Sequence, residues 1–167
     1  GNGTFQDITS LTGININEQV RGCSWFDYNQ DGYLDLYIGL LYEPNLLYKN
    51  NGDGTFIDIA QNVGATGPIG AGIIMGLGAI DYNRDGYQDL YITQDNYNGN
   101  ILLKNENGSF FTDVSYSSQT DLEVMGMGIA FGDINKDGLF DFYTTNLNEN
   151  SLLLNSSDGS FLSLIHI

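Results

Sequence analysis

The sequence predicts an all-β fold, a fragment of a β-propeller with about three four-stranded antiparallel blades. A unit of 52 to 54 residues recurs three times, and each unit divides into four short strand-like segments separated by turn residues. No segment keeps a period of 3.6 residues over ten positions, so we expect almost no helix. Since propellers close with four to eight four-stranded blades, three units predict part of a ring.

Three blocks define the repeat unit. The first reads D-Y-N-x-D-G-Y-x-D-L-Y-I at 27–38 and 81–92 and returns in a varied form at 133–144. The second, N-x-L-x-x-N, occupies 45–50, 100–105 and 150–155. The third is a glycine-containing turn followed by phenylalanine, at 52–59, 107–114 and 158–161, and residues 1–8 match it as well. In the first unit the strands are expected at 20–26, 34–39, 45–49 and 55–59.

The spacing of these blocks predicts where each blade begins and ends. Residues 1–19 are expected to be the end strand of a preceding blade and a linker, followed by blades at 20–60, 61–115 (with its linker) and 116–161. Residues 162–167 depart from the repeat and resemble a translated sequencing adaptor, so we expect an adaptor-derived tail; a natural terminal strand is the alternative. His166, which is the only histidine, lies in this tail and is left out of the functional interpretation.

The charge of the chain argues against nucleic acid as a partner. Twenty-one Asp and Glu residues oppose five Lys and Arg residues, which gives a net charge of −16 and no basic patch for a phosphate backbone. No run approaches the roughly 18 apolar residues of a membrane span. The single cysteine, Cys23, shares an apolar run with Trp25 and Phe26 and is predicted to be a buried core thiol.

The motif D-x-N-x-D-G-x-x-D predicts a calcium loop in each unit. Three carboxylates brought together within nine residues repel one another unless a cation compensates them, and Ca²⁺ accepts six to eight hard oxygen ligands. Positions 1, 3, 5 and 9 supply side-chain oxygens and position 7 supplies its main-chain carbonyl. The predicted ligands are Asp27, Asn29, Asp31, Tyr33 and Asp35; Asp81, Asn83, Asp85, Tyr87 and Asp89; and Asp133, Asn135, Asp137, Leu139 and Asp141. No catalytic residues are predicted.

Other interpretations of the loops explain less. An EF-hand requires a glutamate at position 12, where this chain has Ile38, Ile92 and Thr144. Turns that bind no metal would explain one copy better than three copies that hold nine of the 21 acidic residues. Mg²⁺ prefers fewer protein ligands. Because calcium modules of this kind work at extracellular calcium concentrations, an extracellular, cell-surface or periplasmic location is expected.

At these motifs the chain resembles the FG-GAP (VCBS-type) repeats of integrin-α-like propellers. Within that group it is most similar to the ASPIC/UnbV and cartilage acidic protein family, and the resemblance covers residues 1–161. It implies that each aspartate loop joins the first and second strands of a blade and holds a structural Ca²⁺. The third copy departs at Ile134 and Phe142 but keeps its ligands.

Function is predicted to be recognition instead of catalysis. We expect a module for adhesion, or for binding an extracellular protein or glycan, with the remaining blades of the same propeller as further partners. The variable stretches 39–44, 94–99 and 146–149 are candidate binding loops. Two alternatives stay open: part of a Ca²⁺-dependent polysaccharide lyase or hydrolase, and a propeller lectin that binds sugar through Tyr42, Tyr48 or Tyr97.

Overall fold

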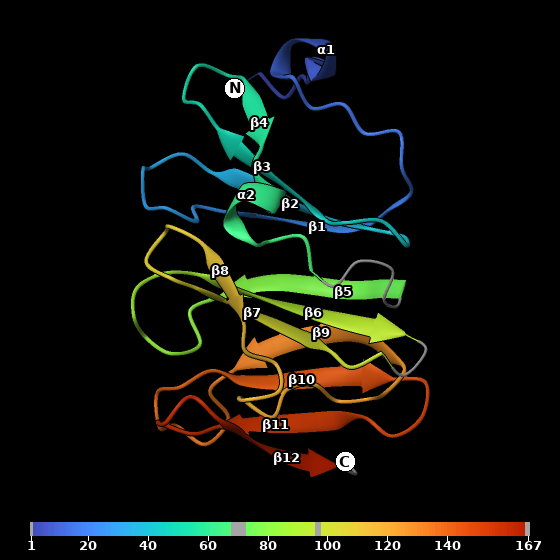
Figure 1. Cartoon of the computed structure of the whole chain (residues 1–167), viewed down its shortest axis with the longest axis vertical. Helices are drawn as coiled ribbons and strands as arrows, with labels where there is room; N and C mark the ends of the chain where they lie inside the picture. The colour runs from blue at the N-terminus through green and yellow to red at the C-terminus, as the bar shows by residue number, and fades with distance from the viewer. Residues whose placement is uncertain (1, 68–72, 96–97, 166–167) are drawn as a thin grey trace.

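Three four-stranded antiparallel sheets make up the fold, stacked one on another as Figure 1 shows. The structure is a computed structural model and describes residues 2–67, 73–95 and 98–165. In each sheet the strands follow one another in sequence order, which is the topology of a propeller blade. The predicted all-β, three-blade architecture is confirmed.

The strand bounds lie close to those expected from the repeat. Blade 1 consists of β1 (Val20–Phe26), β2 (Asp35–Leu40), β3 (Leu46–Asn50) and β4 (Phe56–Asp58). Blade 2 consists of β5 (Ile73–Ile80), β6 (Asp89–Asp95), β7 (Ile101–Asn105) and β8 (Phe111–Asp113). Blade 3 consists of β9 (Gly126–Gly132), β10 (Asp141–Asn146), β11 (Ser151–Asn155) and β12 (Phe161–Ile165).

The core lies between the blades, because both faces of each central strand carry apolar side chains. Every residue of β2 is buried, as are the first six residues of β6. Leu90 and Ile92 face blade 1, in a cluster with Phe26 and Leu47. Tyr91, on the opposite face of the same strand, packs in a cluster with residues of blade 3 that include Phe142 and Leu153. This alternation explains why the second strands lack the polar face of a solvent-exposed sheet.

A short helical turn follows the third sequence block in two repeats, after residues 2–8 and after β4, a feature that the sequence interpretation missed. The turns are α1 (Thr9–Thr12) and α2 (Ala60–Val63), and each ends in a glycine with left-handed backbone, Gly13 and Gly64. A Cβ atom at Gly64 would lie 2.9 Å from the carbonyl oxygen of Phe111, and one at Gly13 would lie 3.0 Å from that of Phe56. Each turn therefore packs closely on the fourth strand of the blade that follows it. These two turns are the helices of the described residues, so the expectation of almost no helix is confirmed. Neither helix is long and apolar enough to cross a membrane.

The segments outside the three predicted blades differ from expectation in detail. Residues 2–8, expected to form an end strand, form none, because a fourth strand needs the third strand of its own blade as partner and no such partner lies beside them in the described residues. At the other end β12 runs to Ile165 and pairs with β11, so residues 162–165 extend the third sheet. Their origin in an adaptor stays a prediction.

The prediction of a buried thiol at Cys23 is wrong. Cys23 is exposed, and Trp25 is 52% exposed. Alternate residues of β1 point to opposite faces, and Phe26 points into the cluster shared with blade 2. Cys23 and Trp25 therefore face away from blade 2, on the same side as Leu36 and Ile38. The Trp25 ring packs edge-on against Phe56 there, with 5.9 Å between the ring centroids. The apolar run marked a strand, but it did not reveal that one face of this strand is open.

Candidate metal loops and the pocket at the opposite edge

The three aspartate loops lie on one edge of the stack. Each joins the first and second strands of its blade, and all three loops project to the left in Figure 1. The connections between the second and third strands lie at the opposite edge. The fold thus separates an acidic edge, which carries the predicted ligands, from an edge built of the variable loops.

Hydrogen bonds organise the first loop around its own carboxylates. The two oxygens of Asp27 accept bonds from the backbone N–H groups of Asp31 (3.1 Å) and Gly32 (2.8 Å). Asn29 Oδ1 accepts from the N–H of Asp31 (3.2 Å), and Asn29 Nδ2 donates to Asp31 Oδ2 (3.0 Å). The N–H of Tyr33 donates to Asp31 Oδ1 (3.0 Å). Positions 1, 3, 5 and 7 are therefore brought together.

The second and third loops repeat this pattern bond for bond. Their corresponding distances lie between 2.8 and 3.2 Å, for the set formed by Asp81, Asn83, Asp85 and Tyr87 and the set formed by Asp133, Asn135, Asp137 and Leu139. The replacement of tyrosine by leucine at position 7 does not alter it, because that residue contributes its backbone.

The carboxylate at position 9 has the same role in all three loops, and this role differs from that of positions 1, 3 and 5. Asp89 is fully buried, and its oxygens accept the N–H groups of Tyr82 (3.2 Å) and Asn105 (2.7 Å). Asp35 and Asp141 bind the equivalent backbone groups of their own blades. Position 9 thus ties its loop to the third strand. Burial raises the pKa of Asp89 to about 7 and raises that of Asp35 as well, against the opposing effect of the two N–H donors.

Basic side chains reach two of the loops from outside the motif. Lys49, from β3, lies 2.8 Å from Asp31 Oδ2, and hydrogen bonds from Lys49 and Asn29 lower the pKa of Asp31. In the third loop the N–H of Leu139 and the Asn135 side chain lower the pKa of Asp137, and the charge of Arg84 adds to this effect. Of the described residues, none forms an ion pair with a carboxylate of the second or the third loop. Lys104 pairs with Glu106, and the charges of Asp85 and Asp89 in the second loop help to raise its pKa.

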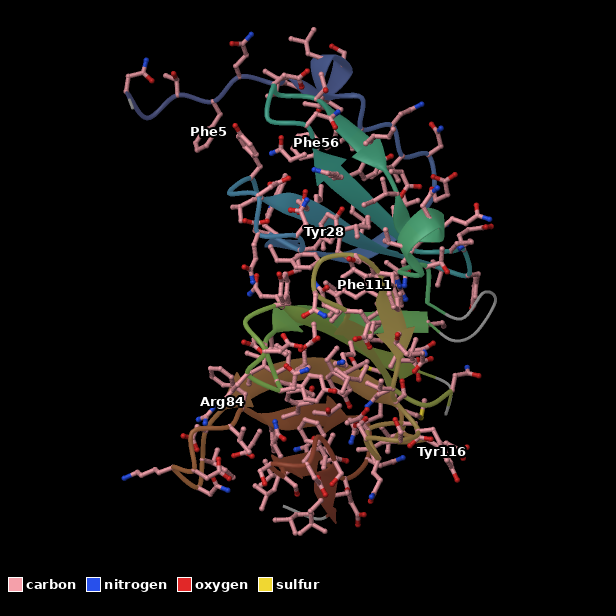
Figure 2. The ribbon with its side chains drawn as sticks, turned by 60° about the vertical axis from the view of Figure 1, so that its left-hand side comes forward. Phe5, Tyr28, Phe56, Arg84, Phe111 and Tyr116 are labelled. Atoms are coloured by element: carbon pink, nitrogen blue, oxygen red, sulfur yellow. The ribbon has the colours of Figure 1, made fainter. Side chains whose placement is uncertain are left out.

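Each loop also contacts the loop of the next blade. Gln30 Nε2 donates to the carbonyl of Gly86 (2.8 Å), and the Arg84 guanidinium lies directly over Gly138. Both residues occupy position 4 of their loops, with left-handed backbone. Figure 2 shows Arg84 at the acidic edge.

An asparagine at the end of the third strand forms a second link between blades. Asn105 Nδ2 donates to the carbonyl of Tyr28 in the first loop (2.8 Å) and to that of Gln88 in its own blade (3.1 Å). Asn155 does the same with Tyr82 (2.8 Å) and Phe140 (3.1 Å). The motif N-x-L-x-x-N thus ends in a residue that pins one blade to the loop of the preceding one.

The donor set of the loops fits a hard divalent cation. Every side-chain ligand in the predicted positions is a carboxylate or amide oxygen, and an oxygen that accepts one N–H bond keeps a second lone pair for a metal. Throughout 2–67, 73–95 and 98–165, however, no three Asp, Glu, His or Cys side chains form a metal-binding group by themselves. Amide and main-chain oxygens would have to complete each site, as the predicted positions 3 and 7 imply. The fifteen predicted ligands stay a prediction.

The opposite edge carries a pocket, formed by blade 2 and the linker after β8, that the loop motifs did not predict. Its volume is about 460 Å³, and its lining is Gln94, Asn98, Gly99, Asn100, Ile101, Asp113, Ser115, Tyr116 and Asp121. Part of this lining comes from the variable stretch 94–99, which the sequence marked as a candidate binding loop. Figure 2 shows Tyr116 on the side of the molecule away from Arg84.

The tyrosines that the sequence offered as sugar-binding candidates are placed differently. Tyr48 is only 5% exposed and donates its hydroxyl to the carbonyl of Asn15 (3.3 Å), so it belongs to the core. Tyr42 is 58% exposed. Tyr97 lies outside the described residues.

Stacked four-stranded sheets with one aspartate loop each define this chain as a set of β-propeller repeats. The model of the FG-GAP-like repeat matches residues 40–92 and 81–144, which together span more than half of the sequence. The chain therefore belongs to the FG-GAP-like repeat family, as the motifs suggested.

Curated relatives agree with this family. Cartilage acidic protein 1 of Xenopus tropicalis is 41% identical over 115 residues, and that of Homo sapiens is 33% identical over 95 residues. These alignments cover 66% and 57% of this chain but only 17% and 14% of the relatives, so the chain spans a small part of the proteins it matches.

A solved structure shares the fold. It is a lectin from Agrocybe aegerita, described by its specific recognition of non-reducing terminal N-acetylglucosamine. The TM-score is 0.52 and the sequence identity 20%, over 84% of this chain and 36% of the lectin chain. At this identity the likeness concerns the arrangement of the strands.

Proposed function

We propose that this chain is a recognition module of an extracellular β-propeller, without catalytic residues of its own, in which calcium in the three aspartate loops stabilises the blade stack. The observation that carries the proposal is the charge of the second and third loops. In each, three aspartates of one nine-residue motif lie without an ion-pairing Lys or Arg among the described residues, and the last of them, Asp89 or Asp141, is buried.

Calcium would supply the missing positive charge. A cation beside Asp89 favours the ionised carboxylate and lowers its pKa again. The residues that would hold it are those at positions 1, 3, 5, 7 and 9 of each loop, while the backbone N–H groups fix the orientation of the side chains. Calcium affinities of such extracellular modules, roughly 10⁻⁴ to 10⁻³ M, support a location outside the cytosol.

Recognition is proposed for the opposite edge, where the loop sequences vary between repeats while the arrangement of the strands stays the same. Variable loops on a rigid scaffold are typical of binding surfaces. The relatives and the lectin-like fold support a protein or glycan ligand for the propeller to which these repeats belong. With a net charge of −16, nucleic acid is a poor partner.

The calcium part of the proposal is tested by thermal unfolding and calorimetry of the 167-residue chain. EGTA is expected to lower the melting temperature by several degrees and added Ca²⁺ to restore it, since a ligand that binds only the folded state stabilises it. Mg²⁺ at the same concentration should restore less.

A matched variant assigns the effect to a loop. Asp81→Asn removes one ligand charge and keeps one of the two oxygens that accept the N–H groups of Asp85 and Gly86. Calorimetry should then show one bound calcium fewer than in the unaltered chain. An unchanged melt in EGTA would reject calcium as a structural ion, and an unchanged stoichiometry would reject the ligand assignment in blade 2.

A further inference from the structure

Two equivalent pockets lie at the edge opposite the aspartate loops, one in each of the first two blades. The blade 2 pocket is described above; the blade 1 pocket has about 200 Å³ and is lined by Pro44, Asn45, Leu46, Asp58, Ala60, Gln61 and Thr66. The repeat aligns these residues with Gly99, Asn100, Ile101, Asp113, Ser115, Tyr116 and Asp121 of blade 2. The two pockets share the buried hydrogen bonds that shape them and differ in the side chains that line their openings.

The framework of the two pockets is the same. Asn100 Oδ1 accepts the N–H of Gln94 (3.1 Å), Asn100 Nδ2 donates to Tyr91 Oη (3.1 Å), and the Tyr91 hydroxyl donates to the carbonyl of Thr120 (3.3 Å). In blade 1 Asn45, Tyr37 and the carbonyl of Ala65 form the same chain of bonds, at 2.8 to 3.1 Å. These buried groups hold the shape and are not available to a ligand.

The outward-facing side chains differ between the two pockets: blade 2 has an aromatic and an acidic residue where blade 1 has neutral polar residues. Gln61 of blade 1 is replaced by Tyr116, whose side chain is 86% exposed, and Thr66 by Asp121. The linker also takes a different course: Asn45 N–H donates to the carbonyl of Thr66, whereas Asn100 N–H donates to that of Leu122, one residue further along the aligned repeat. The second pocket is larger and gains an aromatic ring and a carboxylate.

Two further polar groups lie in the blade 2 pocket. Asp113 is exposed, and one of its oxygens is held by the N–H and the hydroxyl of Ser115, which fixes the direction of the carboxylate. Gln94 is only 2% exposed; its Nε2 donates to the carbonyl of Gly99 (2.9 Å), and its Oε1 has no hydrogen-bond partner. A buried carbonyl oxygen without a donor costs free energy. Gln94 thus belongs to the wall of the pocket, and its buried oxygen, like the Asn100 framework, is not offered to a ligand.

We propose that the blade 2 pocket binds one neutral pyranose residue of a glycan. The Tyr116 ring offers a flat apolar face for the C–H face of the sugar, and the carboxylates of Asp113 and Asp121 accept bonds from its hydroxyl groups. Charge-assisted bonds of this kind are stronger than neutral ones, and amphipathic aromatic rings are typical of such surfaces. The volume lies in the roughly 300 to 1,000 Å³ range of small-ligand sites.

Charge excludes the acidic glycans. The lining contains two carboxylates and no Lys or Arg, so a sulfated or sialylated residue would meet like charge in a chain that is already strongly acidic. The inference rests on the proposed function of the module as a recognition domain, and it names both the pocket and the chemical class of its ligand.

The test is a glycan array with neutral, sulfated and sialylated oligosaccharides, followed by calorimetric titration of the best neutral saccharide into the 167-residue chain. Tyr116→Ala should weaken binding by about tenfold, which corresponds to about 1.4 kcal/mol, because the ring that stacks on the sugar is lost. Tyr116→Phe should stay within about threefold, since it keeps the ring. Asp121→Asn should weaken binding as well.

Gln61→Ala, the equivalent change in blade 1, is the matched control and should leave affinity unchanged. Tyr116 is exposed, so its truncation should not alter the melting temperature, which is measured on each variant. Absence of neutral glycan binding, binding of acidic glycans alone, or affinity that survives both Tyr116→Ala and Asp121→Asn would overturn the inference. The EGTA melt on the same samples reports on the calcium loops separately, so the failure of one proposal is distinguishable from that of the other.

Discussion

The buried aspartate at position 9 is the residue on which each loop depends most. It closes the predicted cation site and at the same time accepts two backbone N–H bonds that join the loop to the third strand. A carboxylate with no exposed surface is destabilised in its ionised form unless a positive charge lies beside it. The proposed binding of calcium would therefore be linked to folding at this residue.

The calcium-free protein should become less stable as the pH rises from about 4 to 7. The pKa of Asp89 is raised to about 7 from its ordinary 3.8, so the folded state binds this proton more tightly than the unfolded state. The stability it contributes is fully present below the unfolded pKa and is lost as the pH approaches the folded pKa. In EGTA, urea unfolding should give a free energy about 2 kcal/mol lower at pH 7 than at pH 5.

Asp89→Asn, which does not titrate, is the control for this effect and should flatten the pH profile. Saturating calcium should also remove the decline, because the cation favours the ionised carboxylate. A decline of equal size in the Asn variant would show that other groups cause it.

At the scale of strands and loops, the asparagine at the end of the third strand connects blade 2 to blade 1 and blade 3 to blade 2. Asn105 satisfies two carbonyl groups, one in each of two blades, and is itself fully buried. Asn50 occupies the same position in blade 1, but its side chain donates only to the carbonyl of Leu34 in its own blade and is partly exposed. The two residues have the same side chain, but only Asn105 makes a hydrogen bond to another blade.

Asn105→Ala should therefore destabilise the chain by about 2 to 4 kcal/mol, since it leaves two buried carbonyl groups without their donor. Asn50→Ala should cost less than about 1 kcal/mol, because water can replace both of its exposed side-chain bonds, to Leu34 and Gly52. Urea denaturation measures both. Equal losses for the two variants would show that the link between blades contributes nothing beyond the turn in which the residue lies.

The sequence predicted strands better than surfaces, and particular residues show why. The bounds of 20–26 for β1 are those of the structure, because alternation and turn residues are local signals. The exposure of Cys23 on that strand depends on what packs against one face of blade 1, which no local pattern encodes. The helical turns α1 and α2 have four residues each, too few to give a helical period.

The two candidate sites also differ in how far local sequence predicts them. The ligand positions of the aspartate loops follow from a spacing of nine residues, and the structure gathers positions 1, 3, 5 and 7 of each loop by local hydrogen bonds. The pocket around Tyr116 combines the end of β6, the start of β7 and the linker after β8, so it arises only when these segments are folded together. Comparison of Gln61 with Tyr116 across the repeats was the sequence signal that could have pointed to it.

At the scale of the whole molecule, the open face of blade 1 gives the chain a built-in chemical reporter. Cys23 is its only cysteine and is exposed on that face. One thiol per chain should react with Ellman's reagent under native conditions, at a rate close to that in urea, because no packing shields it. Protection of the thiol without denaturant, with the melting temperature unchanged, would show that this face is covered in solution, and light scattering would show whether a second copy covers it.

The contacts along the acidic edge connect each aspartate loop to the loop of the neighbouring blade. Gln30 reaches forward to Gly86, Arg84 reaches forward to Gly138, and Asn105 and Asn155 reach back to Tyr28 and Tyr82. Ordering one loop thus restricts the backbone of its neighbour, which is a coupling free energy between sites. Calcium should accordingly fill the edge with positive cooperativity, and the middle loop, held from both sides, should respond most to the occupancy of the other two.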